Sequence, residues 1–175
     1  MSRSEDDIVI VTDAFDDCLW ASHWSKDLRE ASERCDGLVM AYTDRGRHYH
    51  GIGHIAAMLA LFDKHAPAHL DKPPLRWAIL YHDAVYDPRR HDNEAASAAM
   101  MERDLAALGI DSSIRDRVAQ LILATRHGAI AGPLDDATAL LVDIDLAVLA
   151  SSTDIYDGYA AAIRREYAHV PEVDY

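Results

Sequence analysis

Turn-forming segments divide the chain into pieces of helical length, and this feature constrains the fold more than any other. Segments rich in Gly, Pro, Asp and Ser lie at 43–46, 66–74, 87–93, 108–113, 127–136 and 151–154. The pieces between them carry apolar residues at helical spacing, and Pro73 and Pro74 are typical of a helix start. We therefore expect helices over 14–36, 48–65, 74–86, 92–108, 112–126, 137–150 and 153–168.

Length and composition support one all-helical domain. The chain has 175 residues, half of them apolar, which suffices for one buried core, and no repeat or linker divides it. The strand-like run IVIVT at 8–12 is too short and solitary to build a sheet, so it stays unassigned. The predicted fold class is all-α, a helical bundle spanning residues 1–175.

The formal net charge of −13 limits the partners of the protein. A surface this acidic repels long nucleic acids and anionic membranes, and a phosphate substrate would need a bound cation. No signal-peptide pattern or membrane-length apolar run occurs, and Cys18 and Cys35 lack metal or redox spacing. We expect reduced core thiols in a cytoplasmic protein, whose oligomeric state the sequence leaves open.

The tract RGRHYHGIGHI at 45–55 places several histidines at the head of an apolar run. If a helix begins near 48, His50 and His54 lie one turn apart on a face shared with Met58. Buried imidazoles usually just form hydrogen bonds, so a metal site requires further ligands from other segments. Satisfied core histidines and metal ligands both remain open interpretations of the tract alone.

Acids in two other apolar segments supply such ligands. His82 and Asp83 lie in PPLRWAILYHDAVYD, and Asp143 and Asp145 lie in TALLVDIDLAVL. A buried carboxylate without a partner costs several kcal/mol, so Asp83 needs an arginine, a hydrogen-bond network or a cation. Residues two apart on a helix face apart, so at most one of Asp143 and Asp145 is a primary ligand. Together with His50, these residues form a mixed nitrogen and oxygen set that suits manganese, iron, cobalt or zinc better than magnesium.

The order H…HD…D resembles the HD superfamily of metal-dependent phosphohydrolases. The strings that carry the resemblance are RHYHGIGHI, YHDAVYDPRRHDNEAASA, ILATRH and LVDIDLAVLA, and they are similar to a bacterial branch of predicted HD-domain phosphohydrolases. The resemblance covers about residues 42–150. It implies an HD-type helical bundle with a buried divalent metal that hydrolyses a phosphate ester. Members usually continue with further helix, so we expect a shortened form or a chain truncated at its C-terminal part.

The resemblance also implies roles for individual residues. The implied metal ligands are His50, His82, Asp83 and Asp145, with Asp83 also orienting a water. Arg47 would bind the phosphate, and His54 and His127 would contact it or hold a second metal. The usual histidine or glutamate after the His-Asp pair is replaced by AVYD, so proton donation would pass to Glu94 or Asp87. Glu94 could equally be a capping-box partner at a helix start.

The predicted function is hydrolysis of a small phosphorylated metabolite, with a nucleotide as the first candidate, by a water that one or two divalent ions activate. Two alternatives stay open. The surplus of histidines favours a di-iron oxygenase on the same fold, for which iron content and oxygen uptake are the test. A non-catalytic HD-type binding module would retain the helices and lose the ligands.

Overall fold

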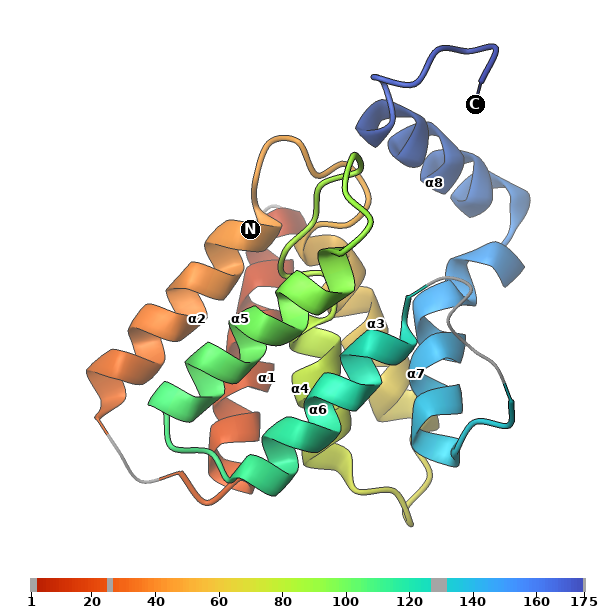
Figure 1. The fold of residues 1–175 in the computed structure, drawn as a ribbon. Coiled ribbons are helices and arrows are strands. Elements are labelled where there is room, and N and C mark those ends of the chain that lie inside the picture. Colours follow the sequence, from red (N-terminus) through yellow and green to blue (C-terminus); the bar gives the residue numbers. More distant parts are fainter. Residues whose placement is uncertain (1–2, 25–26, 127–131, 175) are drawn as a thin grey trace.

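The computed structural model describes residues 3–24, 27–126 and 132–174, and its regular secondary structure there is entirely helical (Figure 1). The elements are α1 (Arg3–Ala21), α2 (Leu28–Tyr42), α3 (Ile52–His65), α4 (Lys72–Tyr81), α5 (Asn93–Ala107), α6 (Ser112–Ala124), α7 (Asp136–Asp145), the 3₁₀ helix η1 (Leu146–Ala150) and α8 (Thr153–Glu166). The predicted all-α fold is confirmed. No helix in the described ranges is both long and apolar enough to cross a membrane.

Helix α4 lies at the centre of the bundle. It packs against α1, α3, α5, α6 and α7, and the five residues from Trp77 to Tyr81 are completely buried. The ring of Phe15 on α1 meets Trp77 edge-on, with centroids 5.1 Å apart. Two prolines occupy its first turn, where missing N–H groups cost nothing. The most buried helix of the protein therefore leads directly into His82 and Asp83.

The expected single helix over 14–36 is wrong, because the chain breaks between α1 and α2. The unassigned run IVIVT is part of α1, where Val11 is fully buried while Val9 and Ile10 are exposed. Helical spacing brings Val11 and Phe15 to the same buried face, so tertiary packing outweighs the strand preference of β-branched residues.

Helix α3 begins later than the expected start at 48, and this changes the geometry of the histidine tract. Gly51 is its N-cap, in extended backbone. A Cβ on Gly51 would lie 3.1 Å from the carbonyl oxygen of Tyr42, so the chain passes tightly over the end of α2. His50 therefore precedes the helix and does not lie one helical turn before His54.

The remaining helices agree closely with the prediction except at two ends. The expected helix over 137–150 changes into η1 after Asp145, and the one over 74–86 stops at Tyr81, with His82 as its C-cap. Both departures place acidic or histidine side chains at helix ends: His82 is the C-cap of α4, and Asp145 is the last residue of α7.

The two thiols behave as predicted. Cys18 on α1 and Cys35 on α2 are buried and unpaired. Burial raises the pKa of Cys18 to about 12 and that of Cys35 to about 11. Both therefore stay protonated at neutral pH and serve as small apolar core residues.

The two valines of α1 provide a test of the helical assignment of IVIVT. Val11 is 0% exposed and Val9 is 46% exposed. We expect Val11→Ala to lower the free energy of unfolding by about 2 kcal/mol through lost burial and a cavity, whereas Val9→Ala should change it by about 0.5 kcal/mol or less. Urea denaturation of both variants measures this. Equal losses would contradict the helical register.

Candidate metal centre

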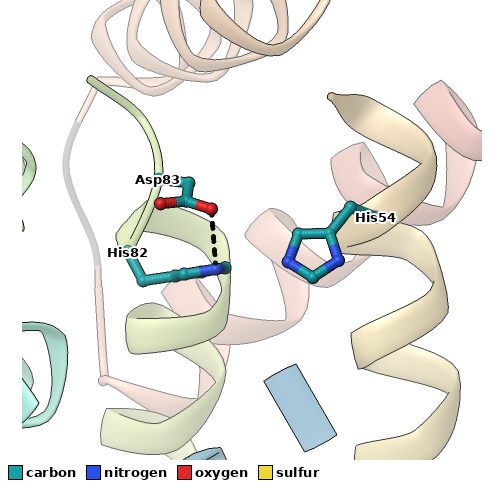
Figure 2. Close-up of side chains that lie close together, drawn as sticks. All are labelled: His54, His82 and Asp83. Atoms are coloured by element: carbon teal, nitrogen blue, oxygen red, sulfur yellow. Dashed lines mark ion pairs between the residues drawn. The ribbon is translucent and has the colours of Figure 1, made fainter. Parts of the chain in front are cut away.

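Two histidines and an aspartate from separate elements meet at the end of α4. His54 lies on α3, and His82 and Asp83 directly follow α4. Figure 2 shows the ring of His54 facing the His82–Asp83 pair. One ligand atom from each of the three lies within 4.8 Å of the others, so this group could hold a metal ion. Imidazole nitrogen and carboxylate oxygen are both ordinary ligands of divalent metals.

Asp145, the last residue of α7, adds a second carboxylate. Its Oδ1 lies 3.1 Å from Nε2 of His54 and 3.7 Å from Nε2 of His82. Asp143, two residues earlier, is exposed. The structure therefore places Asp145, and not Asp143, beside the two histidines. This agrees with the expectation that residues two apart on a helix point to different faces, so that only one of the two acids can reach the group.

The hydrogen bonding of His82 suits a cation. Its Nδ1 lies 3.0 Å from the carbonyl oxygen of Ile79, which can only accept, so Nδ1 carries a proton and Nε2 is the nitrogen that would offer its lone pair to a metal ion. This Nε2 is buried and has no hydrogen-bond partner among the described residues, although Asp83 Oδ2 lies 3.3 Å away. An unsatisfied imidazole nitrogen surrounded by carboxylates is an arrangement that a metal ion would complete.

The electrostatics of the group also require a positive charge. Burial alone would raise the pKa of Asp83, but His82 lowers it to about 2. Burial would likewise raise the pKa of Asp145, and its contacts with His54 and His82 lower it well below the usual value. Conversely, burial would lower the pKa of His82, but Asp83 and Asp145 raise it well above normal. Two ionised carboxylates thus compete for one positive charge, which a proton or a divalent ion can supply.

His50 does not join this group, and here the structure departs from the predicted ligand assignment. Its Nδ1 lies 2.6 Å from Oε2 of Glu166 on α8. Oε1 of the same carboxylate accepts the backbone N–H groups of His48, Tyr49 and His50 at 2.7, 2.7 and 3.0 Å. Glu166 thus holds the bent backbone of residues 48–50, and it is His54, not His50, that lies beside His82 and Asp83.

Arg47 is half-buried and lines a cavity, and its guanidinium holds backbone carbonyls. Its guanidinium donates to the carbonyl oxygens of His50, Asp83 and Ala84 at 2.9, 2.6 and 2.8 Å. It thereby ties the loop before α3 to the end of α4, and it lies over the ring of Tyr42. This geometry favours a role in positioning Asp83 over the predicted contact with phosphate.

A cavity of about 490 Å³ adjoins the group. Its lining includes His82, Asp83, Asp145, the tyrosines Tyr49, Tyr86, Tyr159 and Tyr167, and the basic side chains His50, Arg90, His91 and Arg126. His54 borders a second cavity of about 670 Å³, which Asp145 also lines. The first cavity thus combines the candidate ligands with several basic groups in a protein whose net charge is −13.

The other predicted site residues have different outcomes. Glu94, at the start of α5, lines the first cavity. Asp87 does not line it; its Oδ1 accepts the N–H of Arg89 and its backbone pairs with the side chain of Asn93, so it organises a turn. His127, predicted to contact substrate or a second metal, lies outside the described residues.

Comparisons with protein-family models, curated proteins and solved structures found no match for this chain. The description of this protein therefore rests on its own fold and on the geometry of the candidate site. It is an all-helical protein in which His54, His82 and Asp83 form a group that could hold a metal ion.

His54 and His50 provide a matched pair for testing the ligand set. We expect His54→Ala to weaken binding of Co²⁺ or Zn²⁺ by more than about a hundredfold, because even outer-shell partners of metal ligands contribute ten- to a hundredfold. His50→Ala should change the affinity by less than about tenfold. Calorimetric titration of metal-free protein measures both constants. The reverse order would restore His50 as the ligand.

Proposed function

We propose that this protein is a metal-dependent phosphohydrolase that acts on a small phosphate ester. The observation that carries the proposal is the meeting of two imidazoles and two carboxylates, from α3, the end of α4 and α7, beside a cavity that Arg90 and Arg126 also line. A binding module or a purely structural cluster would have no need for two ionised carboxylates next to an unsatisfied imidazole nitrogen. A proton on His82, whose pKa these two acids raise, offsets part of the cost of burying them, and a divalent ion would supply the second positive charge.

One divalent ion fits the group. His54, His82, Asp83 and Asp145 would hold it, and this mixed nitrogen and oxygen set suits manganese, iron, cobalt or zinc. When bound, such an ion lowers the pKa of a water toward neutrality and polarises a phosphoryl oxygen. The backbone carbonyl of Ile79 fixes the tautomer of His82, and Arg47 fixes the backbone of Asp83. These two contacts preorganise the ligands before any ion arrives.

The basic side chains of the cavity suit an anionic substrate. Arg90 already pairs with Asp92. Arg126 is exposed and has no ion-pair partner in the described part of the chain, so its guanidinium can bind phosphate oxygens. The ionised Asp83 and Asp145 would orient the attacking water toward phosphorus.

The size and aromatic lining of the cavity support a nucleotide as the first candidate substrate. A volume of about 490 Å³ lies within the range of small-molecule pockets. Tyr49 and Tyr159 line the cavity and offer flat rings on which a nucleobase can stack.

Hydrolysis itself is the test of the proposal. Protein purified without chelator should contain a divalent metal and release phosphate from 4-nitrophenyl phosphate or from nucleoside monophosphates, and chelation should abolish this activity. Asp145→Asn should lower kcat/KM by at least about a hundredfold through loss of a ligand, while Asp143→Asn, on the exposed face, should not. A metal-loaded protein that releases no phosphate would contradict the proposal, and oxygen uptake by an iron-loaded form would favour the di-iron alternative.

Arg126 tests the substrate side separately. We expect Arg126→Ala to raise KM by roughly ten- to a hundredfold, the loss of one charged hydrogen bond to phosphate, with the metal content unchanged. Arg29→Ala removes the same charge from an exposed site on α2 and serves as the control. Steady-state kinetics at fixed ionic strength measures both. Equal effects in the two variants would mean that only the overall charge matters.

A further inference from the structure

The second cavity, of about 670 Å³, has a largely apolar wall that the proposed function does not use. The aliphatic side chains of this wall are Ile52, Met58 and Leu61 of α3, Ile144 of α7, Val148 of η1 and Ile155 of α8. Its volume lies within the range of small-molecule pockets. Ile155 is 59% exposed, so part of this wall faces water, and a bound apolar group would cover it.

The four candidate metal ligands lie between the two cavities. His82 and Asp83 line the first cavity, His54 lines the second, and Asp145 lines both. Tyr49 also lines both, and its ring packs on that of His54 with centroids 4.9 Å apart. A phosphate bound at this group would therefore adjoin both cavities.

The two cavities differ in charge. Arg90 and Arg126 line the first. Besides two histidines, the basic residue in the described lining of the second is Arg47, whose guanidinium already donates to three backbone carbonyls. Asp44 and Asp145 add negative charge to the second cavity. An anionic group is therefore favoured in the first cavity, and an uncharged apolar group is favoured in the second.

We propose that the substrate is a phosphodiester whose two ester groups lie in the two cavities, with an apolar alcohol in the second. The inference rests on the proposed phosphohydrolase function and names its substrate class. A monoester would fill only one cavity, whereas a diester can also keep a nucleoside against the tyrosines of the first. Hydrolysis joins the hydroxyl of water to phosphorus, breaks the bond from phosphorus to the oxygen of the apolar alcohol, and leaves the proton of the water on that oxygen. The products are a phosphomonoester and the free alcohol.

The length of the apolar alcohol tests this assignment. Thymidine 5′-monophosphate and its ethyl, butyl and hexyl esters share one nucleoside and differ only in the group proposed for the second cavity. Full burial of a methylene corresponds to about a fourfold gain. We therefore expect kcat/KM of the metal-loaded protein to rise at least about thirtyfold from the ethyl to the hexyl ester, and to be lower for the monophosphate than for the hexyl ester. Chromatography of the products measures these rates.

Two substitutions obstruct the second cavity, and each has a matched control. Ala57→Leu fills space inside the cavity, and Ile155→Asp places a charge on its apolar wall. Ala60→Leu and Ile10→Asp make the same changes at exposed helical positions that line neither cavity. We expect each cavity variant to lower the hexyl-to-ethyl ratio of kcat/KM by at least about tenfold, through lost or charged contact area. Both controls should keep the ratio of the unsubstituted protein.

Binding of the apolar group can also be measured without metal or activity. Met58 lines the second cavity, whereas Met101 is fully buried on α5 and lines neither. In metal-free protein with isotope-labelled methionine methyls, hexanol should shift the NMR signal of Met58 and leave that of Met101 in place. Ala57→Leu should abolish this shift, and Ala60→Leu should retain it.

Each outcome decides the inference. A chain-length dependence that both cavity variants weaken and both controls keep, together with the shift of Met58, supports it. Rates that do not depend on chain length in an active enzyme overturn the inference and leave the proposed function standing, as does hexanol that leaves Met58 unchanged. A metal-loaded protein that cleaves no phosphate ester removes both. If thermal melting shows that Ala57→Leu is unfolded, Ile155→Asp gives the decision.

Discussion

Asp83 and Asp145 keep their charge although their side chains are only 15% and 17% exposed. Such charges are stable only when opposite charge lies beside them, and removal of one partner from a buried pair costs about 3 to 5 kcal/mol. The histidines that supply this charge come from α3 and from the end of α4. The ion pairs of the site therefore depend on the packing of α3, α4 and α7. If these helices moved apart, the ionised carboxylates would lose the positive charge beside them.

Much of the fold follows from local sequence chemistry. Turn residues predict most helix limits, and the apolar run before His82 and Asp83 indicates a helix surrounded by protein, as α4 is. The run IVIVT shows the limit of this reasoning, because β-branched residues favour strands in isolation and only packing against α3 and α4 makes the segment helical.

For a similar reason, the residues of the histidine tract alone do not predict which of its histidines lies beside His82 and Asp83. Gly51 offers a local signal, since glycine before an apolar run is compatible with a helix that starts after it. Glu166, by contrast, lies 116 residues from His50 and sits in an ordinary amphipathic helix. The group that could hold a metal contains His54, whereas the sequence predicted His50 as the ligand from the same tract, and His50 contacts Glu166 instead.

Glu166 also determines where a fragment that keeps all contacts of the candidate site would have to end. The motifs lie between 42 and 150, and α8, which packs on η1, lies beyond them (Figure 1). A fragment cut after 150 would keep every candidate ligand, yet the amides of 48–50 would lose their shared acceptor and the cavity would lose the wall that α8 provides. For truncation, domain grafting or library design, the boundary of this module is thus a hydrogen-bonding residue outside its motifs.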